Sequence, residues 1–156
     1  AAQLTRTGVV GVLATAGTLK ASKYIDTREK WSHDIKVVEH IGQGFVELVE
    51  KGCVSGKEAE ETVMASLKPL LDEGADRIVL GCTHYPFLAE TIHKIAEELY
   101  PDREIEIIDP APAVARHLIE VMREEGLLTS KNTTYNISLH SSGDGTCLEN
   151  TYNNLL

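Results

Sequence analysis

The sequence predicts an α/β fold in which a parallel sheet is covered by helices on both faces. Short apolar runs alternate with longer amphipathic segments along the 156 residues. The first run, residues 8–13, is apolar throughout, as is typical of a strand buried on both faces of a sheet. Small and turn-forming residues separate the segments. Strands that alternate with helices in this way form parallel sheets.

The composition excludes several classes of protein. The net charge of −9 argues against nucleic acid or an anionic membrane surface as the main partner. No apolar run reaches the length of a membrane span, and no segment resembles a signal peptide. The cysteines Cys53, Cys82 and Cys147 are few, odd in number and widely spaced, so we expect no disulfide framework and a reducing, cytoplasmic setting.

In the first third of the chain, two strands and two helices are predicted. The strand at residues 8–13 ends in a small-residue turn at 14–18. A helix follows at about 19–31, and a second strand at 35–41. Residues 45–51 form a short helix that ends before a glycine.

The middle of the chain contains the longest helix predicted from the sequence. Ser55 begins a Ser-Gly-Lys-Glu capping box, and the helix behind it ends at Gly74. Its apolar stripe consists of Ala59, Val63, Leu67, Leu70 and Leu71. A third strand at 77–80, a helix that opens at Pro86 and a fourth strand at 104–108 come next.

The last third of the chain is predicted to differ from the rest. A helix at about 113–125 precedes a candidate strand at 134–140, a turn cluster at 141–145 and an end rich in Asn and Thr that we expect to fray. The chain begins without methionine and enters a core strand within a few residues, and we expect it to be incomplete.

Residues 80–86, Leu-Gly-Cys-Thr-His-Tyr-Pro, carry the most specific chemistry. They join the third strand to the next helix, and ligands of open α/β sheets bind at such strand ends. A helix N-terminus would stabilise a thiolate at Cys82, and His84 would orient or protonate a ligand. Thr83 adds a hydroxyl and an amide. These residues form the candidate site.

Other interpretations of these residues stay open. Free cysteine is commonly a buried apolar residue, and a lone Cys-x-His is compatible with that role. Zinc would need four ligands, and no recognised spacing supplies them. A cysteine hydrolase would need a base and an oxyanion hole from elsewhere in the chain. Thr15 and Thr18, at the end of the first strand, are expected on the same edge of the sheet as Cys82. They suit either contact with a small anion or ordinary turn chemistry.

Three segments together resemble a known family. Residues 80–86 resemble the second cysteine motif of the glutamate racemases, in the cofactor-independent aspartate/glutamate racemase superfamily. Residues 11–20, Gly-Val-Leu-Ala-Thr-Ala-Gly-Thr-Leu-Lys, resemble that family's glycine-threonine segment. Residues 45–52 match the helix between the two. The resemblance covers most of residues 8–125 and implies a parallel-sheet, three-layer sandwich of the racemase type.

The resemblance implies interconversion of L- and D-glutamate for peptidoglycan synthesis, without pyridoxal phosphate or metal. Two cysteines on opposite faces of the substrate would exchange the α-proton, because inversion requires a proton to leave one face and arrive on the other. Cys82 would be one of them, assisted by His84. Thr83, His84, Thr15 and Thr18 would bind the substrate, with a homodimer as a candidate assembly.

The sequence also departs from the family pattern. No segment matches the family's first cysteine or its early Asp-Ser pair, and Cys53 and Cys147 lie in other contexts. Residues 42–44, Gly-Gln-Gly, stand where the family commonly has Ala-Cys-Pro. We therefore expect residues 1–108 to be the second domain, 109–156 to return to a missing first domain, and this chain alone to be inactive. An aspartate racemase and a non-catalytic ligand-binding module are the alternatives.

Overall fold

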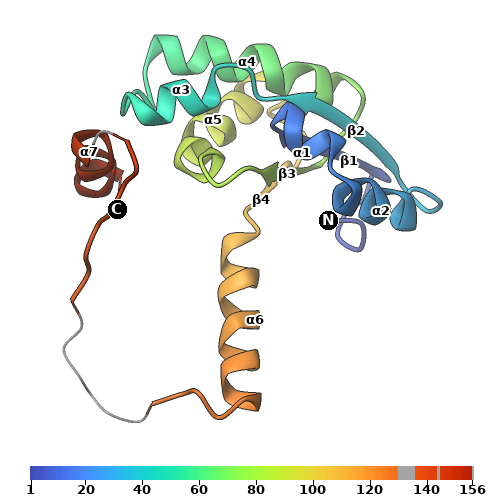
Figure 1. Ribbon diagram of the computed structural model, residues 1–156. Coiled ribbons are helices and arrows are strands. Elements are labelled where there is room, and N and C mark those ends of the chain that lie inside the picture. Colours follow the sequence, from blue (N-terminus) through green and yellow to red (C-terminus); the bar gives the residue numbers. More distant parts are fainter. Residues whose placement is uncertain (130–135, 144, 156) are drawn as a thin grey trace. The chain divides into compact units, whose positions relative to one another are not determined.

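The computed structural model describes residues 1–129, 136–143 and 145–155, which form two compact units, Ala1–Asp109 and Pro110–Leu156. The first unit is built on a sheet of four parallel strands in the order β2-β1-β3-β4 (Figure 1). The strands are β1 (Val9–Ala14), β2 (Lys36–Ile41), β3 (Arg77–Gly81) and β4 (Glu106–Ile108). The predicted parallel sheet is confirmed.

β1 is the central strand, and five of its six residues are buried. It pairs with β2 on one side and β3 on the other, with Ala14 opposite both Ile41 and Gly81. A strand with two neighbours and two covered faces has little contact with water, which explains its uninterrupted apolar sequence.

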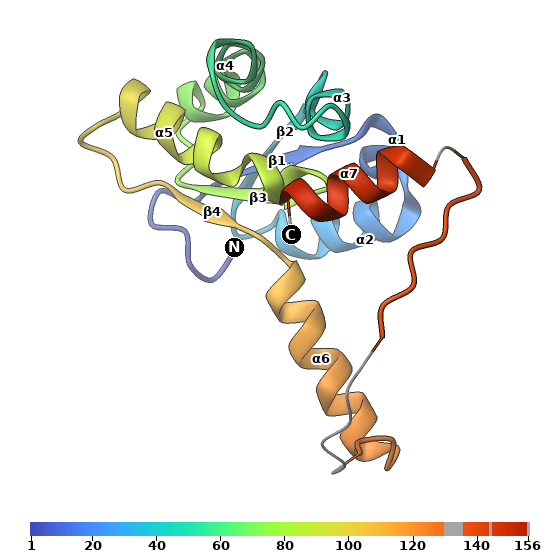
Figure 2. The same ribbon diagram turned by 90° about the vertical axis from the view of Figure 1, so that its left-hand side faces the viewer.

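The helices of the first unit lie in two layers, one on each side of the sheet (Figures 1 and 2). α1 (Ala16–Lys20) and α2 (Ser22–Trp31) connect β1 to β2. α3 (Phe45–Glu50) and α4 (Lys57–Asp72) connect β2 back to β3 and lie on the opposite face from α2. The path along the sheet reverses at β2, and crossovers keep one hand, so the later helices are placed on the other face.

The core lies between the sheet and the layer of α4 and α5 (Ala89–Leu99). The whole predicted stripe of α4 is buried: Ala59, Val63, Leu67, Leu70 and Leu71 are each 0% exposed. α5 adds Ile92, Ile95 and Ala96 to the same core. At about 1.5 to 3 kcal/mol for each large side chain, this burial is the main stabilising contribution of the unit.

The helix predicted at 19–31 is two helices, and it starts earlier. Thr15 is the N-cap of α1, and its side chain accepts a hydrogen bond from the Thr18 amide. Ala21 then takes an extended conformation with ψ of 134°, which separates α1 from α2. The sequence places Thr15 in the turn at 14–18, whereas in the structure that turn is already the start of a helix.

Three further boundaries differ from the prediction. Gly56, at φ of 83°, is the N-cap of α4 and no side chain caps it, so the capping box predicted at Ser55 is wrong. The segment at Pro86 begins as a 3₁₀ turn, η1 (Tyr85–Leu88), and becomes α-helical at Ala89. β4 has three residues rather than the five predicted.

The second unit contains α6 (Ala111–Glu124) and α7 (Gly145–Leu155). α6 agrees with the predicted helix, and it has no buried residue. The strand predicted at 134–140 is wrong for residues 136–140, which form no strand, and its first two residues lie outside the described part. α7 stands where a frayed end was expected. Within the described residues, no helix is long and apolar enough to cross a membrane.

Candidate functional site

The carboxyl ends of β1, β2 and β3 meet at one edge of the sheet. Because Ala14 is opposite both Ile41 and Gly81, the residues that follow, Thr15, Gly42 and Cys82, leave the sheet at the same level. The sequence prediction that Thr15 and Cys82 share an edge is confirmed. In open α/β sheets this is the edge at which ligands bind.

Gly81 allows β3 to approach β1 closely at this edge. A Cβ atom at position 81 would lie 2.8 Å from the Ala14 Cβ and 3.2 Å from the Leu13 carbonyl oxygen. Real Cβ atoms essentially never come within 3.0 Å of a neighbouring atom, so a side chain here would push the strands apart. Close packing of β3 against β1 therefore explains why glycine precedes Cys82.

Cys82 and His84 lie side by side in the turn after β3. The Cys82 Sγ is 3.8 Å from the His84 Nδ1, and both side chains are partly exposed. Thr83, between them, is exposed. A thiol beside an imidazole, reachable from solvent, has the surroundings of a reactive cysteine rather than of a buried apolar one.

Glu50 extends this pair, and no pattern in the sequence predicts its place there. Its Oε1 lies 3.7 Å from the His84 Nε2, on the ring edge opposite the one that faces Cys82. Glu50 is the last residue of α3, 34 positions before His84, and no motif spacing connects the two. The carboxylate faces the ring and helps to orient it, so the three side chains form a line from Glu50 through His84 to Cys82.

Thr15 and Thr18 contact each other at the end of β1. Their hydroxyl oxygens are 3.0 Å apart, and the Thr15 Oγ1 also accepts from the Thr18 amide at 3.3 Å. The turn chemistry considered from the sequence is therefore present. Strand register places the same hydroxyls at the edge that carries the thiol–imidazole pair.

Tyr85 anchors the turn after β3 to the core. Its side chain is fully buried, its hydroxyl donates to the Gly42 carbonyl at 3.2 Å, and its ring packs edge-on against Phe45 with centroids 4.9 Å apart. Burial, together with the negative charge available at Cys82, raises the pKa of Tyr85 to about 12. Tyr85 therefore stays a hydrogen-bond donor at neutral pH.

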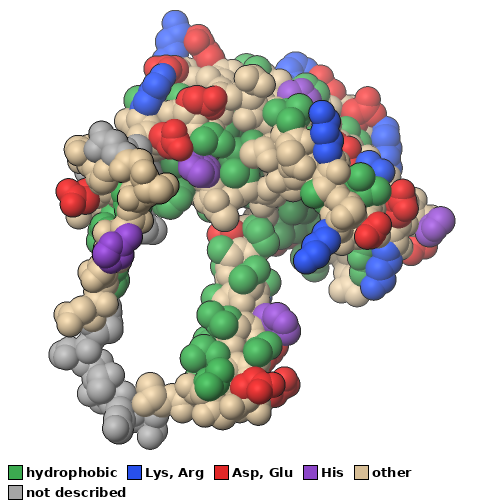
Figure 3. Space-filling model, in the orientation of Figure 1, with side chains coloured by type: hydrophobic (Ala, Val, Ile, Leu, Met, Phe, Trp, Pro, Cys, Tyr) green, Lys and Arg blue, Asp and Glu red, His purple; other side chains and the backbone are tan. Residues whose placement is uncertain are grey.

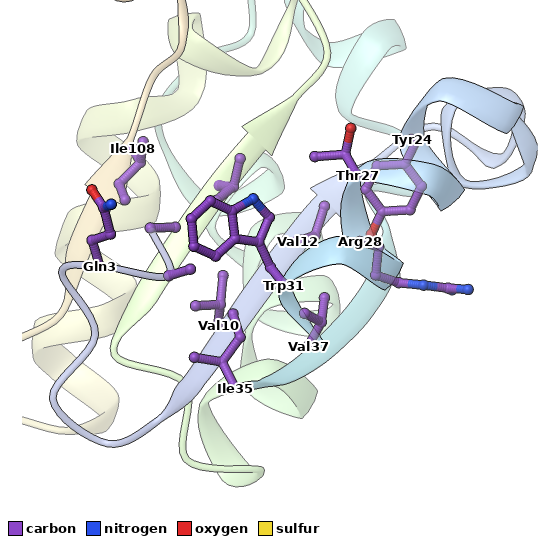
Figure 4. A pocket seen from close by; sticks show the side chains of 13 residues that line it. Gln3, Val10, Val12, Tyr24, Thr27, Arg28, Trp31, Ile35, Val37 and Ile108 are labelled. Atoms are coloured by element: carbon purple, nitrogen blue, oxygen red, sulfur yellow. The ribbon is translucent and has the colours of Figure 1, made fainter. Parts of the chain in front are cut away.

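A separate cavity of about 430 Å³ lies on the α2 side of the sheet (Figure 4). Trp31 of α2 points into it, over apolar side chains from all four strands: Val10, Val12, Val37, Val79 and Ile108. Tyr24 and Arg28, at its margin, both hydrogen-bond to Glu39. None of the predicted site residues lines this cavity. It is distinct from the candidate site.

Fold and site together define an α/β protein that presents a thiol–imidazole pair at the carboxyl edge of a parallel sheet. The profile of the Asp/Glu/Hydantoin racemase family matches residues 1–118. The chain belongs to this family.

Curated relatives agree with this assignment. The chain is 40% identical over 144 residues to the glutamate racemase of Stutzerimonas stutzeri, covering 92% of this chain and 52% of that protein. It is 41% identical over 133 residues to the glutamate racemase of Roseiflexus sp., covering 85% of this chain and 47% of that protein. The chain thus spans about half the length of the curated relatives it matches.

Solved structures give the same result for the fold. Glutamate racemase from Francisella tularensis in complex with D-glutamate has a TM-score of 0.69 at 30% identity, covering 80% of this chain and 45% of that one. Glutamate racemase isoform RacE1 from Bacillus anthracis has a TM-score of 0.69 at 29% identity, over 82% and 46% of the two chains. The predicted racemase-type fold is confirmed.

Proposed function

We propose that this chain carries one half of the active site of a glutamate racemase, with Cys82 as one of two proton-transferring thiols. The Cys82–His84 pair at the carboxyl edge of the sheet, in a chain about 40% identical to glutamate racemases, carries the proposal. The structural relative from Francisella tularensis binds D-glutamate, which supports glutamate as the substrate.

In the proposed reaction, Cys82 as thiolate removes the α-proton from one face of glutamate, or as thiol delivers a proton to that face. The second thiol does the opposite on the other face, so that configuration inverts without net gain or loss of protons. His84 assists the transfer at Cys82, and Glu50 holds the imidazole in place. Thr83, Thr15 and Thr18 bind the polar groups of the substrate at the same edge.

We further propose that residues 109–156 return to a domain that this chain does not contain. α6 supports this, because it is amphipathic and buries none of its side chains. Apolar side chains are visible along it in the space-filling view (Figure 3), and Val114, Leu118 and Ile119 are 67%, 58% and 46% exposed. A helix of this kind normally packs its apolar face against a neighbour.

The rest of the proposal follows from the same assignment. The product D-glutamate would serve peptidoglycan synthesis in the cytoplasm, and a homodimer is the candidate assembly. Sedimentation equilibrium of the active protein measures the assembly state, with a mass of two chains expected and a single-chain mass counting against it.

The first prediction concerns activity. This chain alone should not racemise L-glutamate, because inversion needs a second proton-transferring group on the opposite face. A chimera in which the chain replaces the segment it matches in the Stutzerimonas stutzeri enzyme should be active, and Cys82→Ala in it should lower kcat at least ~10³-fold. Circular dichroism of the glutamate solution measures both.

The Cys53→Ala chimera is the matched control, because Cys53 lies in the loop after α3 and is a free, partly exposed thiol. Its activity should equal that of the parent chimera. Full activity of Cys82→Ala would refute the assignment of the thiol. Faster racemisation of aspartate than of glutamate would favour the alternative member of the superfamily. A chimera that folds and binds glutamate without turnover would favour the non-catalytic module.

A further inference from the structure

Tyr85 connects the turn that holds Cys82, Thr83 and His84, here called the site turn, to α3. It has no role in the chemistry described above. Its amide donates to the Cys82 carbonyl at 3.2 Å, so its backbone is part of the turn that carries the thiol. Its side chain points away from that turn into the core, where the hydroxyl reaches Gly42 and the ring reaches Phe45. Phe45 is the first residue of α3.

The acceptor of the Tyr85 hydroxyl is itself held in place. The Gly42 amide donates to the Ala14 carbonyl at 3.2 Å, at the end of β1. The Ser66 hydroxyl of α4 donates to the neighbouring Ile41 carbonyl at 3.2 Å. Gly42 also has no space for a side chain, since its Cβ would lie 2.6 Å from the Tyr85 Oη. The hydroxyl therefore binds a carbonyl whose own backbone is held at the sheet edge by hydrogen bonds.

The site turn thus meets α3 twice. Tyr85 contacts its beginning at Phe45, and His84, one residue earlier, contacts its end at Glu50. The six residues of α3, with these contacts at its two ends, span about 9 Å of helix. If the first contact shifts, the second shifts as well, because a single helix joins them. The distance from Glu50 to His84 therefore depends on the position in which the Tyr85 side chain is held.

We propose that Tyr85 is a positioning residue: its buried hydroxyl seats the turn against the start of α3 and thereby sets the contact between Glu50 and His84 at the end of that helix. The catalytic meaning of this contact rests on the proposed function. The positioning itself does not depend on the proposed function, because it concerns only groups within the first unit. Without the hydroxyl, His84 is held less well beside the Cys82 sulfur.

The test is the rate at which iodoacetamide alkylates Cys82 in the whole chain, followed by peptide mass spectrometry. A neighbouring imidazole makes a thiol more nucleophilic, so Tyr85→Phe should slow the alkylation of Cys82 at least threefold. Glu50→Gln should slow it similarly. In the double variant the two effects should not multiply, because Tyr85 acts through the Glu50–His84 contact.

Two controls separate positioning from general loosening. Tyr24→Phe removes another hydroxyl that donates to a protein acceptor, Glu39, and should leave the alkylation of Cys82 unchanged. Cys53, in the same molecule, should react at the same rate in every variant. Effects that multiply in the double variant, or a parallel change at Cys53, would overturn the proposal.

An unfolded Tyr85→Phe chain would overturn it too, because it would show a structural role and would speed both alkylations. The result is also separate from the racemase assay. Alkylation is measured without substrate, so an inactive chimera would refute the proposed function and leave the positioning of Tyr85 standing. If Tyr85→Phe slows the alkylation of Cys82 but the chimera is inactive, the proposed function has failed. If the chimera is active but Tyr85→Phe does not slow the alkylation, the positioning role of Tyr85 has failed.

Discussion

At the scale of single residues, the site depends on side chains brought together from distant parts of the chain. Cys82 and His84 are two positions apart, and the sequence alone predicts that both lie in the turn after β3. Glu50 reaches His84 from α3, and Tyr85 reaches Gly42 across 43 positions. Only the local pair has a sequence signature, because the other contacts require strand order and helix placement.

Glu50 gives a prediction at this scale. In the active chimera, Glu50→Gln should lower kcat about tenfold, equivalent to ~1.4 kcal/mol of transition-state stabilisation, and change KM much less. The glutamine keeps the size of the side chain but removes the charge that holds the imidazole. Steady-state kinetics in both directions measure the effect. Glu58→Gln, at the exposed start of α4, is the control, and an unchanged kcat for Glu50→Gln would remove Glu50 from the proposed site.

At the scale of elements, two glycines let neighbouring segments approach closely beside the site. Gly81 permits β3 to lie against the end of β1, and Gly42 makes room for the buried ring of Tyr85. Gly42 stands where the resemblance leads one to expect a larger residue. The structure accounts for glycine here through the space that Tyr85 and Phe45 fill, whatever the arrangement in relatives.

Gly42→Ala should therefore destabilise the first unit by about 1 to 3 kcal/mol through overpacking. The new Cβ would lie 2.6 Å from the Tyr85 Oη and 2.9 Å from the Phe45 Cδ2, and both rings are buried. Urea unfolding followed by circular dichroism measures the change. Gly17→Ala is the control, because its Cβ would meet no atom closer than 4.0 Å and it lies in α1. Equal midpoints for the two variants would contradict the packing argument.

At the scale of the whole first unit, a buried carboxylate joins the start of the chain to the amino end of β3. Asp76 accepts hydrogen bonds from the Thr5 hydroxyl and from the amides of Arg6 and Thr7. Burial by itself raises the pKa of this carboxyl, but the three donors outweigh burial, and the pKa lies below its ordinary value. The folded state is therefore stabilised by the ionised form.

The lowered pKa of Asp76 predicts how the free energy of unfolding depends on pH. The unfolded chain binds the proton at higher pH than the folded one, so the contribution of Asp76 is complete above about pH 4 and is lost as the pH falls through the lowered pKa. Asp76→Asn should cost about 1 to 3 kcal/mol at pH 7 and less at pH 2. Urea titrations at several pH values measure this. The exposed Asp34→Asn should change little at any pH, and a pH-independent cost at Asp76 would contradict the assignment.

The order of elements in the first unit was predictable from the sequence, and their boundaries were less so. The stripe of α4 and the apolar run of β1 carry strong signals, because burial repeats with the period of the element. The sequence did not predict the N-caps of α1 and α4, since Thr15 caps α1 from within a turn and Gly56 caps α4 with no side chain at all. α7 was missed because its Asn- and Thr-rich sequence has weak helix propensity.

The sequence by itself determined the parallel α/β class, the family resemblance and the turn that holds Cys82 and His84, because periodicity and short motifs are local properties. Tertiary structure alone decided that Gly42 leaves the sheet at the level of Thr15 and Cys82, that Glu50 faces His84, and that the Tyr85 hydroxyl binds the Gly42 carbonyl. These contacts depend on strand register and on the face that each crossover covers. Neither is set by neighbouring residues, since both arise only when distant segments pack together.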